Sequence, residues 1–205
     1  MLKDRSSDTI AAVATAMSSS GIGIVRVSGS DAFSIVNEIF ESKKKNFDLR
    51  KAPSHRVHYG MIKDGEEILD EVLVIAMRGP HSYTAEDTVE IDCHGGVLVM
   101  KKILETVIKY GARPAEPGEF TKRAFLNGRI DLSQAEAVMD VIHSKNDYAM
   151  KSSVSQLKGS LSRKIRKLRE DILYQIAFIE SALDDPEHIS LEAVSYTHLT
   201  LPTIL

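Results

Sequence analysis

The chain has 205 residues, of which 43% are hydrophobic and 27% charged, and its formal net charge is −3. These ordinary globular values exclude a disordered chain and a protein that binds nucleic acid through bulk positive charge, so any RNA contact requires a local patch. No apolar run reaches the roughly 18–20 residues that span a membrane, and no signal peptide follows Met1. The single cysteine, Cys93, excludes an internal disulfide. Composition therefore predicts a soluble, cytoplasmic protein.

The first half of the chain alternates strand-like and helix-like patterns. Runs of β-branched or alternating apolar residues predict strands over residues 9–13, 22–27, 57–61, 68–77 and 88–93. Helical spacing predicts one helix after Asp31 and a second over residues 97–110, ended by a left-handed Gly111. Asp64-Gly65 predicts a hairpin turn. The basic run 43–45 is interpreted as a solvated loop.

A Pro/Gly cluster at residues 114–118 separates this half from a helical one. Three helices are predicted in this half. The first covers residues 119–126, and the second begins at a capping box at Ser133–Glu136 and ends at about Ser144. The third is one amphipathic helix over residues 147–183. The last of these would be roughly 55 Å long at 1.5 Å per residue. Its apolar stripe requires a neighbour, either helices absent from the chain or a partner subunit.

The predicted fold class is α+β: an N-terminal α/β domain over residues 1–118, then an all-helical segment over 119–192 with one long helix. Residues 193–205 have no helical period. They are interpreted as a non-native tail, with a natural short strand as the alternative.

Three ionisable residues, Glu90, Asp92 and His94, share one face of the predicted strand at 88–93, opposite an apolar face. A metal site is one interpretation, although ligands at i, i+2 and i+4 of a strand spread over about 13 Å. Recognition of a heterocycle is a second, because a carboxylate can accept two parallel hydrogen bonds from an amidine-like edge. The third is the solvated face of an edge strand.

Arg26 interrupts an otherwise apolar strand sequence, so its guanidinium must be paired or must reach a ligand. An edge position, an internal ion pair and an anion-binding role all satisfy this requirement. Gly21 and Gly23 do not have the spacing of a dinucleotide-binding loop. Cys93 lacks a paired base and is not expected to be a nucleophile.

Basic residues crowd positions 158–169 of the long helix. They are interpreted either as a solvated face or as an RNA-phosphate contact, which would show steep salt dependence. The candidate contacts are Arg163, Lys164, Arg166 and Lys167.

Five stretches in register carry a family resemblance, at residues 21–29, 82–87, 90–96, 117–121 and 123–132, and residues 134–137 extend it. Together they resemble the MnmE (TrmE) family of tRNA-modification GTPases over about residues 8–192. The resemblance implies a folate-binding domain like that of the aminomethyltransferases, which forms a homodimer, followed by a helical domain that carries an inserted GTPase domain.

The resemblance also implies ligands, partners and site residues. Folate contacts of the family fall on Arg26, Glu90 and Arg129, the last at a position where the family often has lysine. The expected cofactor is a reduced folate, 5-formyl- or methylene-tetrahydrofolate, as the one-carbon source for modification of the wobble uridine of tRNA at carbon 5. An FAD-dependent MnmG-type protein is the expected partner, and no membrane or metal is expected.

Two family features do not occur in these 205 residues: the Gly-x-x-x-x-Gly-Lys-Ser/Thr phosphate loop and the Asn-Lys-x-Asp guanine motif. GTP, magnesium and potassium are therefore expected only in a GTPase module outside this chain, which alone should have no catalytic residue and no GTPase activity. The alternative is a freestanding, non-catalytic folate-binding and dimerisation module. A third class, a folate-dependent aminomethyltransferase, is matched at the level of fold alone.

Overall fold

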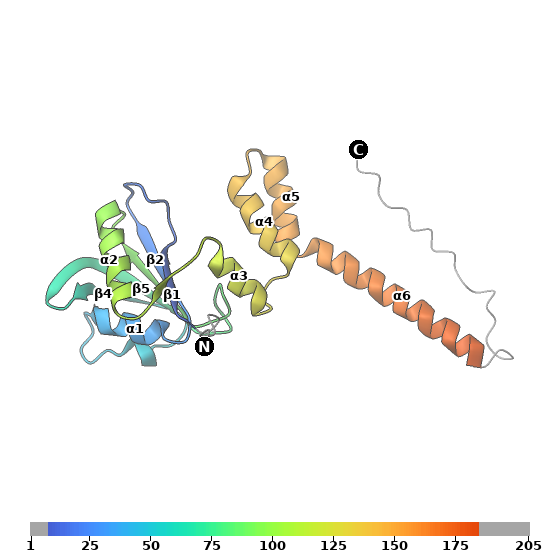
Figure 1. Ribbon diagram of the computed structural model, residues 1–205, viewed down its shortest axis with the longest axis horizontal. Helices are drawn as coiled ribbons and strands as arrows, with labels where there is room; N and C mark the ends of the chain where they lie inside the picture. The colour runs from blue at the N-terminus through green and yellow to red at the C-terminus, as the bar shows by residue number, and fades with distance from the viewer. Residues whose placement is uncertain (1–7, 185–205) are drawn as a thin grey trace, which may run out of the picture. The chain divides into compact units, whose positions relative to one another are not determined.

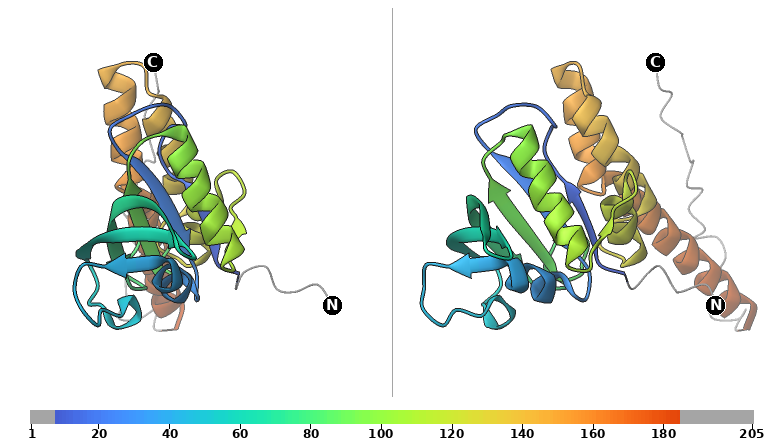
Figure 2. Two further views of the ribbon diagram at one scale, coloured as in Figure 1. Left: turned by 90° about the vertical axis from the view of Figure 1, so that its left-hand side faces the viewer. Right: turned by 60° about the vertical axis from the view of Figure 1, so that its left-hand side comes forward.

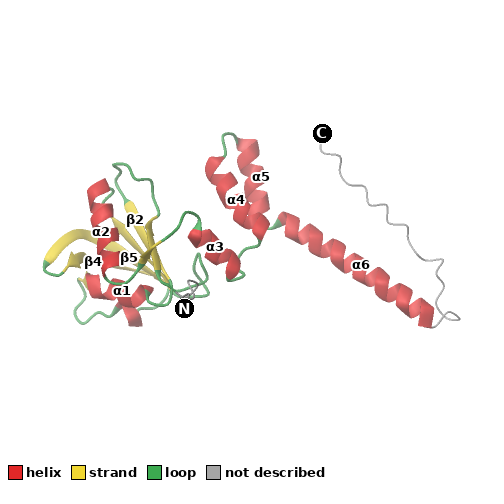
Figure 3. Cartoon of the chain, in the orientation of Figure 1, coloured by secondary structure: helices red, strands yellow, loops and turns green. Residues whose placement is uncertain are grey.

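The computed structural model describes residues 8–184 and divides into two compact units, Met1–Ala135 and Glu136–Leu205. Figure 3 shows strands only in the first unit and helices alone in the second. The predicted α+β class, with an all-helical segment after the sheet domain, is therefore confirmed. The boundary near Gly118 stays a prediction, and the proposed tail at 193–205 lies outside the described residues.

The first unit is built on a seven-stranded sheet with the order β3-β4-β5-β6-β2-β1-β7. Neighbouring strands are antiparallel except for the parallel pair β1 and β7. The strands are β1 Ile10–Val13, β2 Gly23–Ser28, β3 Phe40–Ser42, β4 Arg56–Asp64, β5 Glu67–Met77, β6 Thr88–Cys93 and β7 Arg113–Pro114. All five predicted strands are present. β3 and β7 were not predicted, because two or three residues carry no readable period.

Two helices, α1 Ala32–Ile39 and α2 Val97–Lys109, pack on one face of the sheet (Figures 1 and 2). Alternate strand residues such as Val25, Val89 and Ile91 are fully buried beneath them. The predicted turn at Asp64-Gly65 joins β4 to β5, with Gly65 at φ 61°. Gly111 follows α2 at φ 122°, as its left-handed capping role requires.

Polar side chains attach α3, Glu119–Leu126, and the loop before β6 to this unit. Asn127 Nδ2 donates to the carbonyl of Thr84 at 2.7 Å, and the Thr84 hydroxyl lies 2.7 Å from that of Ser28 on β2. Both hydroxyls are fully buried. Because buried polar groups are costly to leave unpaired, these bonds fix the loop at the end of β2.

The predicted capping box at Ser133–Glu136 is wrong in its residues. Helix α4, Leu132–His143, is capped two residues earlier. Asp131 Oδ1 accepts from the amide of Gln134 at 2.9 Å, and Gln134 Oε1 accepts from the amide of Asp131 at 3.0 Å. Asp131 thus takes the N-cap role that was predicted for Ser133, and the Ser133 hydroxyl donates to the same Asp131 oxygen.

The single helix predicted over residues 147–183 is also wrong, since two helices occupy it: α5 Asp147–Leu157 and α6 Ser160–Asp184. Gly159 separates them at φ 74°, a left-handed conformation that only glycine adopts without strain. Its amide bonds to the Gln156 carbonyl at 2.8 Å, which ends α5. No helix in the described part of the chain is long and apolar enough to cross a membrane.

The apolar stripe of α6 remains solvent-accessible. Ile165 is 57% exposed, Ile172 48% and Leu183 69%. A shallow hollow of about 510 Å³ runs along this stripe between Leu168 and Ile179. The expectation that the stripe requires a covering neighbour stays a prediction.

Candidate functional site: a charged cluster on the open face of the sheet

Arg26 and Glu90 lie directly opposite each other on β2 and β6, in the middle of the sheet. Arg26 Nε donates to Glu90 Oε1 at 2.7 Å, and the two side chains are only 22% and 17% exposed. The structure therefore supports the internal ion pair among the interpretations of Arg26. It excludes the edge-strand interpretation for both residues, because β2 and β6 each pair with strands on both sides.

Aromatic rings cover this ion pair. The guanidinium carbon of Arg26 lies 4.9 Å from the centre of the Tyr83 ring and 5.4 Å from that of Phe120. Arg129 stacks on the same Tyr83 ring at 4.7 Å. The structure thus brings together all three residues expected to contact folate, Arg26, Glu90 and Arg129, around Tyr83. Cation–π contacts of this kind each contribute about 0.5–1 kcal/mol where the cation is partly exposed.

Tyr83 and Phe120 were not predicted from the sequence as site residues. Tyr83 lies in the loop before β6 and Phe120 in α3, and neither position has a periodic pattern that predicts its direction. The Tyr83 hydroxyl bonds to Thr121 Oγ1 at 2.9 Å, which holds the loop against α3. The only signal was that both residues fall in stretches that carry the family resemblance.

Beside the aromatic pair, an ionic network holds α3 in place. Glu119 accepts from Arg113 at 2.6 Å and from Arg123 at 3.2 Å, and Arg123 also contacts Glu86 at 3.1 Å. The hydrogen bonds from Arg113, together with those from the Glu116 amide and Arg123, lower the pKa of Glu119 to about 2. Glu119 and Arg123 are both buried, so this network is a rigid support for Phe120 between them.

A second carboxylate, Asp92, lies two residues beyond Glu90 on the same strand. Its Oδ1 atom is buried without a hydrogen-bond partner in the described part of the chain. Burial, and secondly the charge of Glu90, raise the pKa of Asp92. Glu90 Oε2 likewise has no protein donor among the described residues, so the face offers two unfilled acceptors to a ligand rich in N–H groups.

His94, the third residue of this face, is engaged by Asp70 on β5. Its ring Nδ1 lies 2.7 Å from Asp70 Oδ1, and its amide donates to Oδ2 at 2.8 Å. The hydrogen bond to Asp70 raises the pKa of His94. Residues 8–184 contain no group of three histidine, cysteine, aspartate or glutamate side chains placed to hold a metal ion.

Cys93 points to the opposite, buried face. Its thiol donates to the Gly23 carbonyl at 3.3 Å. Burial raises its pKa to about 11, and the charges of Asp70 and Asp92 add to this effect. A thiol that stays protonated at neutral pH is a poor nucleophile.

The four basic residues singled out on the long helix lie on α6. Arg163, Lys164, Arg166 and Lys167 are all exposed, and none forms an ion pair within the described residues. One of them, Arg163, donates to the Lys158 carbonyl at 2.6 Å.

The fold and site define an α+β domain with a charged, aromatic-covered cluster on its open sheet face, continued by a helical segment. Two family models match in that order: the N-terminus of the GTP-binding protein TrmE over residues 9–129, and the MnmE helical domain over residues 132–201. The chain therefore belongs to the MnmE (TrmE) family, as the sequence resemblance indicated.

Curated relatives agree with this assignment. The tRNA modification GTPase MnmE of Lachnoclostridium phytofermentans is 62% identical over 188 residues, which cover 92% of this chain and 41% of that protein. The proteins of the same name from Acetivibrio thermocellus and Bacillus thuringiensis are 54% and 50% identical and cover 88% and 94% of the chain. The chain spans about two fifths of the length of these relatives.

Proposed function

We propose that the cluster around Tyr83 binds a reduced folate, 5-formyl- or methylene-tetrahydrofolate. The observation that carries the proposal is the Glu90 carboxylate, which is held by Arg26 through one oxygen and has its second oxygen unfilled. A pterin ring presents parallel N–H donors along one edge. Glu90 Oε2 can accept one of them, and Oε1, which accepts only from Arg26 among the described residues, keeps a second lone pair for the other. Asp92 Oδ1, buried without a partner, adds a further acceptor on the same face.

The aromatic and cationic groups fit the rest of such a ligand. Tyr83 and Phe120 offer flat surfaces for a heterocycle, and Arg129, which is exposed, offers a cation for the glutamate carboxylates of a folate. Because Arg26 already contacts Glu90 and both rings, it orients the carboxylate and needs no large rearrangement on binding.

For the whole protein we propose GTP hydrolysis coupled to modification of the wobble uridine of tRNA, with folate as the one-carbon source and an FAD-dependent MnmG-type partner. This proposal is supported by the relatives, which are named tRNA modification GTPases, and by the family membership of this chain. We further propose that the chain forms a homodimer, functions in the cytoplasm, and contacts RNA phosphates through Arg163, Lys164, Arg166 and Lys167.

Calorimetric titration of the chain with 5-formyltetrahydrofolate tests the folate proposal. Glu90→Gln and Arg26→Ala should each weaken binding by about 1.5–3 kcal/mol, the range for hydrogen bonds to charged groups. Glu105→Gln, on the exposed surface of α2, is the matched control and should bind as the wild type does. Failure of a folded wild-type chain to bind, or equal binding by Glu90→Gln, would reject this site.

A further inference from the structure

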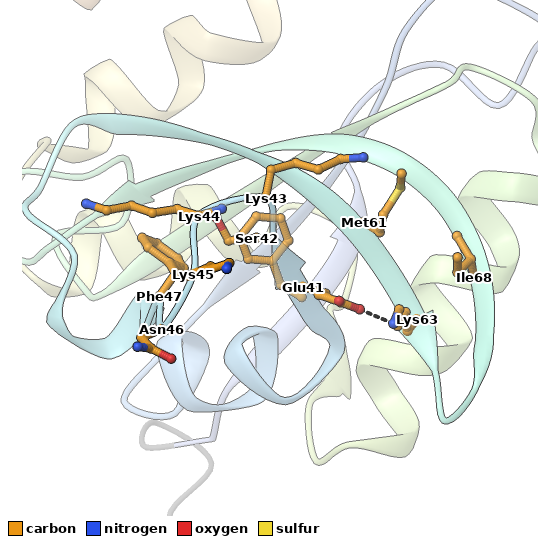
Figure 4. Close-up of a pocket in the computed structure, with 11 residues that line it drawn as sticks. Glu41, Ser42, Lys43, Lys44, Lys45, Asn46, Phe47, Met61, Lys63 and Ile68 are labelled. Carbon is orange, nitrogen blue, oxygen red and sulfur yellow. Dashed lines mark hydrogen bonds and ion pairs between the residues drawn. The ribbon is translucent and has the colours of Figure 1, made fainter.

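A basic hollow lies at the β3–β4 edge of the sheet, on the loop that the sequence analysis interpreted as solvated. It encloses about 680 Å³ (Figure 4). Its charged lining is one carboxylate, Glu41, and four lysines: Lys43, Lys44, Lys45 and Lys63. Lysines at this density repel one another, so an unliganded cluster of them is electrostatically unfavourable and attracts anions.

A second hollow of about 480 Å³ adjoins the first and shares Lys44, Asn46 and Phe47 with it. Its charged lining adds Lys51 and Arg56 and the carboxylate of Asp48. The two hollows together are lined by six cationic side chains and two carboxylates. We name this surface the β3–β4 basic edge.

Ion pairs within the protein neutralise only some of the cationic side chains of the β3–β4 basic edge. Lys63 is paired with Glu41, and Lys43 lies 3.9 Å from Glu71. Lys44 and Lys45 form no ion pair within the described residues, and both are exposed. These two lysines therefore leave positive charge available to an external anion.

The loop that carries the lysines has a defined shape. The Lys44 amide donates to Ser42 Oγ at 3.1 Å, and Asn46 takes a left-handed turn at φ 55°. Phe47 then packs edge-on against Phe40, with ring centres 6.0 Å apart, and against His58 at 4.6 Å. The lysines thus extend from an anchored loop, which lowers the entropy cost of forming contacts with a ligand.

We propose that the β3–β4 basic edge binds the phosphate backbone of RNA. Figure 4 shows the Lys43 and Lys44 side chains extending in opposite directions from the loop, which suits successive phosphates of a strand better than one small anion. The chain carries a net charge of −3, so binding of a polyanion requires such a local patch. The Phe47 ring, which is half-buried, lines both hollows and offers an apolar surface beside the lysines to an unpaired base.

The choice of RNA as the polyanion rests on the proposed function, because the relatives are named as tRNA-modifying proteins. The β3–β4 basic edge belongs to a different part of the sheet from the proposed folate cluster, which lies on β2 and β6. The two proposals can therefore fail separately.

Fluorescence anisotropy of the chain with a labelled, unmodified tRNA transcript, over a series of salt concentrations, tests this site. The Lys44→Ala/Lys45→Ala variant should bind roughly tenfold more weakly at low salt, since each lost phosphate contact removes counterion release. Its slope of log affinity against log salt should fall by about 2, one for each lysine. Lys101→Ala/Lys151→Ala removes two charges from exposed positions on α2 and α5 and should match the wild type.

The following outcomes would overturn the proposal that the β3–β4 basic edge binds RNA. An unchanged salt slope in Lys44→Ala/Lys45→Ala, or an equal loss in Lys101→Ala/Lys151→Ala, would mean that these lysines form no specific contact. If Arg166→Ala/Lys167→Ala lost RNA binding and Lys44→Ala/Lys45→Ala kept it, the RNA would contact α6 and not the β3–β4 basic edge. Absence of RNA binding at low salt would reject the site outright. Folate titration of Lys44→Ala/Lys45→Ala separates the proposals, because normal folate binding there shows that a failure concerns RNA alone.

Discussion

Arg26 and Glu90 face each other across β2 and β6, and their side chains meet at 2.7 Å beneath the Tyr83 ring. The pair is mostly withdrawn from solvent, so removing one partner leaves the other charge poorly compensated. The same pair is the core of the proposed folate site. Its contribution to stability must therefore be measured separately from its contribution to binding.

Arg26→Ala and Glu90→Gln should each lower the free energy of unfolding by about 1–3 kcal/mol, the range for leaving a partly buried polar group without its partner. The double variant should be less destabilised than the sum, with a coupling of about 1 kcal/mol or more between contacting residues. Urea unfolding of the four proteins measures this cycle. Additive losses would contradict a direct interaction.

Acid should weaken the ionic network of Glu119 with Arg113 and Arg123, which holds α3 in place. The pKa of Glu119 is about 2 in the folded protein, below its ordinary value of 4.5, because Arg113, the Glu116 amide and Arg123 donate to it. A lowered carboxyl pKa stabilises the fold above the unfolded pKa, so this contribution is complete above about pH 4.5. It is lost as the pH falls towards 2.

The fall of the Glu119 pKa from 4.5 to about 2 corresponds to about 3.5 kcal/mol in full, at roughly 1.4 kcal/mol for each pKa unit, and about 2.5 kcal/mol of it should be lost between pH 6 and pH 2.5. Urea unfolding at pH values from 6 down to 2.5 measures it. Glu119→Gln should be less stable than the wild type at pH 6 and should show a flatter profile below pH 4.5. Glu105→Gln, which alters an exposed carboxylate, is the control. If Glu119→Gln showed the same dependence of stability on pH as the wild type, the Glu119 carboxyl would not be the cause of the loss in acid.

Cys93 should be unreactive in the native protein. The residue is 4% exposed, and its thiol donates to the Gly23 carbonyl and has a pKa raised to about 11 by burial. At pH 8 a thiol reagent should label the folded chain at least tenfold more slowly than the chain in denaturant, because the thiolate is the reacting form. Mass spectrometry measures the rate of labelling at Cys93. Equally rapid labelling of the folded and the denatured chain would show that this thiol is not buried.

Two glycines with positive φ should respond differently to substitution by alanine. Gly29, at φ 135°, would place a Cβ 2.7 Å from the Thr9 Cα, whereas Gly65, at φ 61°, has open space. Gly65→Ala should therefore cost only about 1–2 kcal/mol, the ordinary penalty of a left-handed residue. Gly29→Ala should cost clearly more, because the backbone must also move. Thermal unfolding of both variants compares them, and equal melting temperatures would remove the steric argument.

The sequence by itself determined the elements that have a strong local signal. The alternation at residues 88–93 and the helical spacing at 97–110 fixed β6, α2 and the faces that they bury, since side-chain direction follows from backbone period alone. The Asp64-Gly65 turn and the Gly111 cap followed from glycine's access to positive φ. Local rules failed at Gly159, where one residue divides a continuous apolar pattern into α5 and α6.

Only the tertiary structure decided how the site is assembled. The sequence distinguished Arg26 and Glu90 as unusual residues, but residues 64 positions apart become partners only through the β2–β6 register. Tyr83 and Phe120 come from a loop and a short helix, whose direction depends on long-range contacts such as that of Asn127 with Thr84. The lysines at 43–45 are an ordinary basic run in the sequence. They become a shaped, cationic surface because Phe47 anchors their loop against Phe40 and His58.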